Sequence, residues 1–313
     1  MKIVYMGTPD FAVGPLRALI EAGYEVTAVV TQPDKPKGRS GQLIPPPVKS
    51  CALEYGIPVF QPAKIKTPEA VDMLRQYEAD IFVVAAFGQI LSGEILEMPR
   101  LGCINIHASL LPKYRGAAPI QWAIIDGEKE TGVTIQQMDI GVDTGDILSR
   151  TIVPITEEDT GASLFDKLCI AGSSLLIETL PRLEAGEITP LPQDEKQATH
   201  AKMLTKELGN IDFSAPAAKI ACLVRGLNSW PSAYTYYEGK MMKIWKACPV
   251  EEDSSSAAPG QIMAVHKDSI DVACGEGILR IYEIQMEGKK RMSVKDFMLG
   301  HAFSTGTCFA RIK

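Results

Sequence analysis

The sequence predicts an α/β protein: a Rossmann-like, mostly parallel sheet with helices on both faces, followed by a small, OB-like C-terminal β-barrel. Three observations support this fold class. Strand-like and helix-like segments alternate up to residue 87, a long amphipathic helix is expected at 160–184, and the residues after 210 contain mainly short strand-like runs. The 313 residues, 46% of them hydrophobic, are enough for two ordinary domains.

The first domain opens with the apolar run 2–6, typical of a buried strand, and with an amphipathic helix that extends to about residue 22. The alternation continues with strands expected at 26–31, 57–60 and 81–87, and with helices expected at 48–55 and 67–77. Thr67 and Pro68 suit the N-cap and first position of a helix. The first strand-to-helix turn lacks the second glycine of a dinucleotide fingerprint, so a dinucleotide site is not expected.

Polar side chains gather at the end of the next expected strand, 103–107. Because side chains alternate along a strand, Asn105 and His107 should share one face. A short helix at 120–126 and another β-branched run at 132–138 lead into the acidic, Gly-rich loop 139–146. That loop can return a carboxylate, Asp143, to the histidine.

The sequence divides into a first domain at 1–185, a polar linker with two prolines at 186–207, and a second domain at 208–313. The second domain should begin with a helix near 215–227. Its strands are expected at 233–237, 241–247, 260–266, 269–273 and 278–285. Small barrels of this kind often bind oligonucleotides.

Charge differs between the two parts of the chain. Residues 1–199 contain 17 Lys and Arg against 26 Asp and Glu, whereas residues 200–313 contain 15 against 12. The basic second part favours a polyanionic partner, although chance scatter of solvated charge would give the same count. Seven scattered cysteines favour reduced thiols. No apolar run approaches the ~20 residues of a membrane span, so we expect a cytoplasmic protein without a membrane partner.

A long basic segment, 34–49, separates the second expected strand from its helix. It carries four cations and is too long for a simple connection in an α/β unit. Such a loop can contact phosphate, and the alternative is an ordinary solvated insertion. The four candidate contacts are Lys35, Lys37, Arg39 and Lys49.

The residues Asn105, His107 and Asp143 suit the stabilisation of an oxyanion. An amide and a protonated imidazole both donate hydrogen bonds to a carbonyl oxygen that gains negative charge, and a nearby carboxylate favours the charged ring. A metal site is disfavoured because the other histidines are remote and Asn is a poor zinc ligand. A serine hydrolase is disfavoured because no Gly-x-Ser-x-Gly elbow is present. The alternative is that His107 is a core histidine and Asn105 a turn former.

These residues lie within a longer pattern that resembles the 10-formyltetrahydrofolate-dependent formyltransferases. The pattern runs from Asn105-x-His107 through Ser109-Leu110-Leu111-Pro112-x-Tyr114-Arg115-Gly116 to Gly141-x-Asp143-Thr144-Gly145. The resemblance spans the whole chain and is strongest over 1–150. With the basic loop and the second domain, it is closest to those members that act on initiator methionyl-tRNA.

The resemblance implies formyl transfer from the folate to the α-amine of methionine on initiator tRNA. We further expect a monomer without a bound metal, although the sequence itself does not give the oligomeric state. The resemblance also implies that Asn105 and His107 stabilise the oxyanion, and that Asp143 orients His107 and relays a proton. It places tRNA against the basic loop and the second domain. The folate would contact three segments, made up of Phe87, Gly88, Gln89, Ile90 and Leu91; Ser109, Leu110, Leu111 and Pro112; and Ile140, Gly141 and Val142.

Two other interpretations remain open. A formyltransferase for another acceptor, such as an amino-sugar nucleotide or glycinamide ribonucleotide, or a formyl-folate hydrolase, would share residues 87–145 without needing the basic loop. A non-catalytic RNA-binding protein would need no convergent oxyanion donors.

Overall fold

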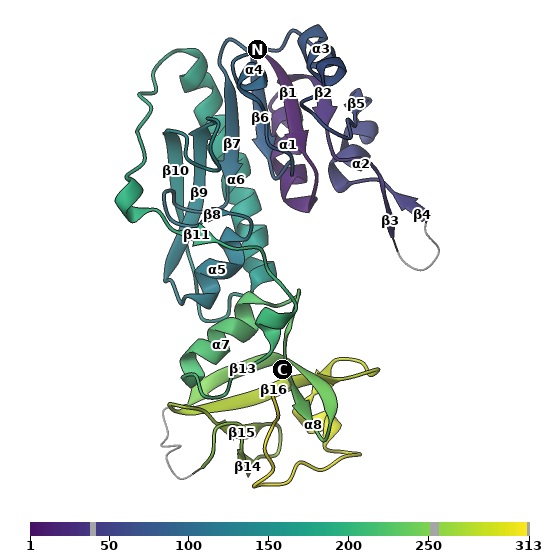
Figure 1. The fold of residues 1–313 in the computed structure, drawn as a ribbon, viewed down its shortest axis with the longest axis vertical. Helices are drawn as coiled ribbons and strands as arrows, with labels where there is room; N and C mark the ends of the chain where they lie inside the picture. Colours follow the sequence, from purple (N-terminus) through teal and green to yellow (C-terminus); the bar gives the residue numbers. More distant parts are fainter. Residues whose placement is uncertain (38–41, 251–256, 312–313) are drawn as a thin grey trace. The chain divides into compact units, whose positions relative to one another are not determined.

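The computed structural model describes residues 1–37, 42–250 and 257–311, which fold as two compact units (Figure 1). The first unit consists of Met1–Pro119, Glu130–Pro154 and Phe165–Ala201. The second consists of Ile120–Lys129, Ile155–Leu164 and Lys202–Lys313. Much of the expected linker, up to residue 201, therefore lies within the first unit. The expected domain limits at 185 and 208 stay a prediction.

The first unit is built on a seven-stranded sheet. In spatial order its strands are β10 (Ile147–Pro154), β9 (Glu130–Gln137), β7 (Cys103–His107), β6 (Ile81–Ala85), β1 (Lys2–Gly7), β2 (Glu25–Val30) and β5 (Val59–Phe60). The strands from β7 to β5 are parallel, whereas β9 runs antiparallel to β7, and β10 antiparallel to β9. The mostly parallel sheet is confirmed. The edge strand β10 is an addition that the sequence analysis does not predict.

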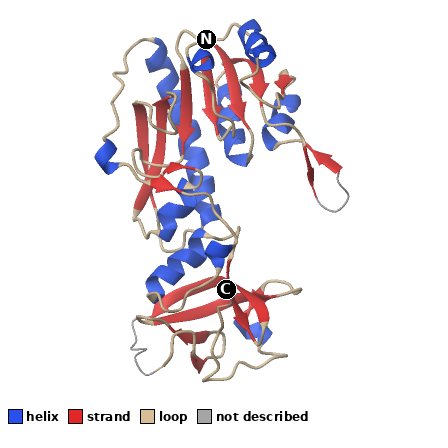
Figure 2. Cartoon of the chain, viewed as in Figure 1, coloured by secondary structure: helices blue, strands red, loops and turns tan. Residues whose placement is uncertain are grey.

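Helices cover this sheet (Figure 2). Those of the first unit are α1 (Val13–Glu21), α2 (Pro47–Glu54), α3 (Pro68–Gln76), α4 (Gly93–Leu96) and most of α6 (Gly161–Glu184), with short 3-10 turns at Asp10–Ala12 and Glu195–Gln197. Helix α5 (Pro119–Ile125), from Ile120 on, and the 3-10 turn at Glu207–Gly209 belong to the second unit. The Thr67 hydroxyl accepts from the N–H of Ala70 and caps α3, as its position predicts.

The two faces of the sheet pack against different helices. Buried side chains of β1 and β6 form one cluster with α3 and α4, and Cys103 of β7 belongs to it. On the opposite face of β7, Ile106 packs closely against Gly172 of α6. Because side chains alternate, Asn105 and His107 lie on the same face as Cys103. Along β7 this face is therefore apolar at Cys103 and polar from Asn105 to the carboxyl end.

Two small sheets lie beside the main one. The basic loop forms a hairpin of β3 (Lys35–Lys37) and β4 (Gln42–Ile44). Its two ordered strands are a feature that the sequence analysis does not predict. The other sheet joins β8 (Arg115–Gly116) to β11 (His200–Ala201) in parallel.

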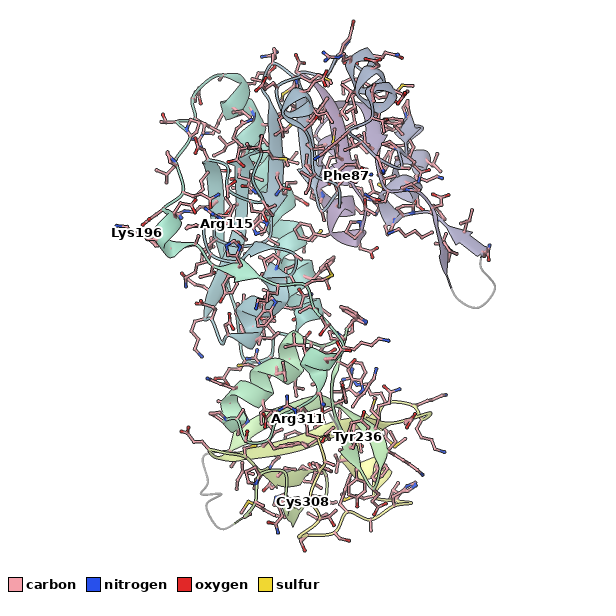
Figure 3. All side chains as sticks on the ribbon, in the orientation of Figure 1. Phe87, Arg115, Lys196, Tyr236, Cys308 and Arg311 are labelled. Carbon is pink, nitrogen blue, oxygen red and sulfur yellow. The ribbon has the colours of Figure 1, made fainter. Side chains whose placement is uncertain are left out.

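The second unit is an antiparallel sheet with helices α7 (Ala217–Gly226) and α8 (Val294–Phe297). Its strands are β12 (Ala233–Tyr237), β13 (Lys240–Val250), β16 (Ile278–Met286), β15 (Ile270–Ala273) and β14 (Ile262–Val265), with β17 (Met292–Ser293) paired to β16. Near the C-terminus, Ala310 pairs with Tyr236 of β12, and Cys308 pairs with Gln261 beside β14 (Figure 3). The C-terminal segment thus bonds both edges of the sheet and closes it, which agrees with the expected barrel.

Within the described residues, no helix combines the length and apolar character that a membrane crossing requires.

Candidate active site

Strands β7 and β9 place four polar side chains together. In their antiparallel register Asn105 lies opposite Gln136, and His107 lies opposite Thr134. Directly opposed residues share a face, so the four side chains form one polar patch at the end of an otherwise apolar layer. His107, Thr134 and Gln136 are buried, whereas Asn105 is half-buried.

Asp143 brings a carboxylate to this patch, as the sequence predicts. One oxygen, Oδ1, accepts from Gln136 Nε2 at 2.9 Å and lies 3.4 Å from Asn105 Nδ2. The other oxygen, Oδ2, accepts from the backbone N–H of Gly116 at 2.8 Å. The two short contacts fix the carboxylate from both sides, so Asp143 has little freedom to turn away from the patch.

The His107 ring lies between two oxygen atoms. Its Nε2 is 2.9 Å from the carbonyl oxygen of Tyr114, and its Nδ1 is 3.5 Å from Asp143 Oδ1. A carbonyl oxygen can only accept, so Nε2 carries a proton in this arrangement. The Nδ1 contact is long and therefore weak, which makes it the side more readily exchanged for a substrate oxygen.

The loop that presents Asp143 is held by its own chemistry. Asp139 Oδ1 accepts from the N–H of Gly141 at 3.0 Å and from Thr144 Oγ1 at 2.6 Å, which closes a tight turn. At Gly145 a Cβ atom would lie 1.7 Å from the carbonyl oxygen of Gln137, so only glycine fits there. Asp143 itself has φ +55°, a left-handed conformation that the surrounding contacts must stabilise.

The segment from Ser109 to Pro112 bonds Thr134 in the middle of β9. Thr134 Oγ1 donates to the carbonyl of Ser109 at 2.7 Å and accepts from the N–H of Leu111 at 3.1 Å. Ser109 Oγ donates to the carbonyl of Lys113 at 2.6 Å. Ser109 and Leu111 are buried, while Leu110 and Pro112 are half-buried. This segment is therefore anchored to the same strand that carries Gln136.

The segment 87–91 is also anchored. The carbonyl of Phe87 accepts from Thr8 Oγ1 and Gln32 Nε2, so it is not free for a ligand. Gln89 bonds the backbone of Ile65 and Pro62. Phe87 and Leu91 are buried. Of the five candidate residues here, Gly88 and Ile90 are exposed, and Gly88 has the left-handed φ of +84°.

Exposed apolar side chains mark the two outer candidate segments. Ile90 is 62% exposed, Ile140 is 82% exposed and Val142 is 58% exposed. Large apolar side chains so open to water are typical of surfaces that a ligand covers. The neighbouring Gly141 is exposed as well.

The four candidate tRNA contacts differ in their surroundings. Lys49 Nζ bonds both oxygens of Asp34, at 2.9 and 2.8 Å, and Gln61 Oε1, so its charge is already paired. Hydrogen bonds from Gln61 and Lys49 hold the pKa of Asp34 below its usual range. Lys35 is exposed on the hairpin. Lys37 ends β3, and Arg39 lies outside the described residues.

The structure adds partners that the sequence analysis does not single out. Gln136 and Gly116 bind the Asp143 carboxylate, and Gln193 donates to the carbonyls of Asp143 and Gly145. Only the register of β7 against β9 places Gln136 beside Asn105, and a sequence does not give that register. Among the described residues, no group of three or more His, Cys, Asp or Glu could hold a metal ion.

Comparison with known proteins identifies relatives over nearly the whole chain. Residues 1–180 match the family described as formyl transferase, and residues 203–302 match its C-terminal domain. The methionyl-tRNA formyltransferase of Lachnospira eligens is 53% identical over 310 residues, covering 98% of each chain. That of Caldanaerobacter subterraneus is 50% identical over 308 residues, covering 98% of this chain and 99% of the relative.

Solved structures share the fold at lower identity. An N-formyltransferase from Helicobacter canadensis, in complex with folinic acid and dTDP-3-aminofucose, has a TM-score of 0.66 at 20% identity, covering 93% of this chain and 100% of that one. HypX from Aquifex aeolicus, in complex with tetrahydrofolic acid, has a TM-score of 0.63 at 20% identity, covering 96% of this chain and 47% of that one.

Proposed function

The chain belongs to the methionyl-tRNA formyltransferases of the formyl transferase family, and on that premise we propose what its site does. It transfers the formyl group of 10-formyltetrahydrofolate to the α-amine of methionine esterified to initiator tRNA. The observation that carries the proposal is that Asn105, His107 and Asp143 lie together in one anchored patch. It is supported by relatives of about the same length that are methionyl-tRNA formyltransferases.

The reaction is an acyl transfer in which atoms and charges must balance. The amine nitrogen bonds the formyl carbon, the bond from that carbon to N10 of the folate breaks, and one proton passes from the amine to N10. Negative charge gathers on the formyl oxygen between these steps. Asn105 Nδ2 and His107 are the donors that meet this charge, and removing one such donor typically costs ~10²–10³ in rate.

Asp143 supports the two donors. Its carboxylate lies 3.5 Å from His107 Nδ1 and 3.4 Å from Asn105 Nδ2, and we assign it the orientation of both side chains. We assign it the relay of the transferred proton as well. Its own position is set by Gly116 and Gln136 and does not depend on substrate.

The folate is proposed to lie against the segments 87–91, 109–112 and 140–142. Ile90, Ile140 and Val142 offer it exposed apolar contacts, and Gly88 and Gly141 leave their backbones accessible. The buried Phe87 and Leu91 and the half-buried Gln89 would act by shaping this surface, since the Phe87 carbonyl and the Gln89 amide already have protein partners.

The tRNA is proposed to contact the basic hairpin and the second unit. Lys35, Lys37 and Arg39 are the hairpin's candidate phosphate contacts, whereas Lys49 anchors its base through Asp34. In the second unit two cations lie over the ring of Trp245, with Lys243 Nζ at 5.7 Å and the Arg291 guanidinium at 5.0 Å from the ring centre. Cations interleaved with an aromatic ring suit a nucleic acid surface.

We propose further that the protein acts as a monomer in the cytoplasm. Both oxygens of the Asp143 carboxylate are bonded by residues of its own chain. Sedimentation at assay concentrations should give a mass near 34.0 kDa. Activity confined to a heavier species would contradict the monomer.

The function is tested by product identification. The purified protein is incubated with radiolabelled methionyl-initiator tRNA and 10-formyltetrahydrofolate, and the amino acid is then released by hydrolysis. Formylmethionine that requires the folate is the expected product. Release of free formate would indicate a hydrolase, and transfer only to an amino-sugar nucleotide or glycinamide ribonucleotide would indicate another acceptor; either result would overturn the proposal.

A further inference from the structure

A segment remote in sequence bonds the loops of the candidate site. Residues 191–201, called the strap here, begin where Leu191 pairs with Ile147 of β10. They end in β11, which pairs with β8. Between these points the strap also bonds the residue before β8, because Thr199 Oγ1 accepts from the N–H of Tyr114 at 2.8 Å. The strap is therefore tied to the chain on both sides of Asp143.

One side chain of the strap bonds the Asp143 loop directly. Gln193 Nε2 donates to the carbonyl of Asp143 at 2.9 Å and to the carbonyl of Gly145 at 2.7 Å. Both N–H groups of this amide are thus used on the backbone of a single loop. Asp143 has a left-handed φ of +55°, so its backbone needs outside contacts of this kind to stay in place.

The other end of the same amide is held by a buried arginine. Gln193 Oε1 accepts from Arg115 Nε at 3.0 Å and from its NH2 group at 2.9 Å. Two further N–H groups of the guanidinium donate to the two oxygens of Glu195, at 3.0 and 2.7 Å. The Arg115 side chain is 3% exposed, whereas Glu195 is 70% exposed. The hydrogen bonds from Arg115 hold the pKa of Glu195 below its usual range.

Arg115 lies between the two residues that bond the catalytic side chains. The carbonyl of Tyr114 contacts His107, and the N–H of Gly116 contacts Asp143. The buried side chain of Arg115, labelled in Figure 3, instead bonds Gln193. The backbone on either side of Arg115 therefore contacts the catalytic residues, while the side chain of Arg115 contacts the strap.

We propose that Gln193 and Arg115 are positioning residues of the transfer reaction, and that the strap sets the geometry of Asp143 through them. The proposal rests on the function assigned to Asp143 above. A neutral amide is required at residue 193, because its oxygen must accept from Arg115 while its nitrogen donates to two carbonyls. Neither carboxylate nor thioether can do both.

The test compares three substitutions in the full-length chain under saturating substrates. Gln193→Met keeps the length of the side chain but removes all four hydrogen bonds, and should lower kcat by about tenfold to hundredfold. Gln193→Glu keeps an acceptor for Arg115 and loses only the two hydrogen bonds donated to the loop, so its kcat should fall by a comparable factor. The control is Gln197→Met, because Gln197 is exposed and bonds only Asp194 within the described strap. It should retain wild-type kcat.

A double-mutant cycle distinguishes positioning of Asp143 from general damage. If Gln193 acts through Asp143, Gln193→Met should lower kcat by less than about twofold when Asp143 is already Asn. The same tenfold or larger factor in both backgrounds would show that the two residues act independently and would overturn the proposal. Normal kcat for Gln193→Glu would also overturn it, since the strap would then need only its bond to Arg115.

Failure of the proposed function gives a different result. In that case the wild-type protein itself forms no formylmethionyl-tRNA, and no variant comparison is reached. If Gln193→Met does not fold, the cycle is run with Gln193→Glu, which retains the pairing of the buried guanidinium. The proposal is supported only when the wild type is active and the loss depends on Asp143.

Discussion

The Asp143 carboxylate offers the sharpest perturbation of the site. Asp143→Asn keeps the shape of the side chain but turns one acceptor oxygen into an NH2 group. With that group toward Gly116, two N–H groups face each other across the present 2.8 Å contact. With it toward the patch, it faces the amide of Gln136 and the ring of His107. Either orientation leaves at least one buried donor without an acceptor.

The cost can be worked from these contacts. A buried N–H group left unpaired costs about 1–3 kcal/mol, so the first unit should lose that much stability and the melting temperature should fall by a few degrees. The catalytic loss should be larger. A neutral amide no longer offers Asn105 and His107 one charged acceptor that orients them, so the variant should lose roughly what one oxyanion donor supplies, ~10²–10³ in kcat.

The assay is steady-state formylation at saturating folate and tRNA, with thermal unfolding measured on the same samples. The matched control is Asp146→Asn. Asp146 lies in the same loop, and its carboxylate has no hydrogen bond or ion pair with any residue that the structure describes. That variant should keep both kcat and melting temperature. An Asp143→Asn protein with wild-type kcat would refute the role of the carboxylate, whatever its stability.

Three further predictions concern other parts of the chain. Lys35→Ala should reduce the log–log salt slope of tRNA binding by ~0.7–0.9, measured by filter binding, whereas a slope unchanged from wild type would remove the hairpin from the interface. Gly145→Ala should abolish most formylation because of the 1.7 Å approach to Gln137, while Gly93→Ala, with open space around it, should be near normal; equal activities would contradict the packing argument. Burial acts to raise the pKa of Asp271, but hydrogen bonds from Arg280 and His266 leave it lowered. The stabilisation that goes with a lowered pKa is present above the unfolded value of ~3.9 and is lost as the pH falls through the lower, folded value. The urea concentration at the unfolding midpoint of the second unit should therefore decrease as the pH falls through that range, and Asp271→Asn should flatten this dependence.

Periodicity allowed much of the fold to be predicted. Strand β7 has the predicted bounds, and its alternation correctly put Asn105 and His107 on one face. The cap at Thr67 was readable because it depends on local sequence alone. The edge strand β10 and the hairpin β3–β4 were not predicted. The hairpin strands have three residues each, and β10 lies at the edge of the sheet. Each of these strands is defined by its pairing partner more than by its own sequence pattern.

The supporting residues of the site were harder to find. Gln136 faces Asn105 only because of the register between β9 and β7, and a shift by one residue would have put Gln137 there. Gln193 acts from fifty positions beyond the loop that it bonds. The pairing of Lys49 with Asp34 likewise depends on how the loop turns back on α2. Contacts of this kind are tertiary, and residue spacing carries no signal for them.

The most direct measurement is the single-turnover rate of formyl transfer by the wild type and by Asn105→Ala and His107→Ala, with folate affinity measured in parallel. If the two side chains stabilise the developing oxyanion, each substitution should lower the transfer rate by ~10²–10³ while folate binding is largely kept. Transfer at the wild-type rate in either variant would contradict the assignment of this patch as the catalytic centre.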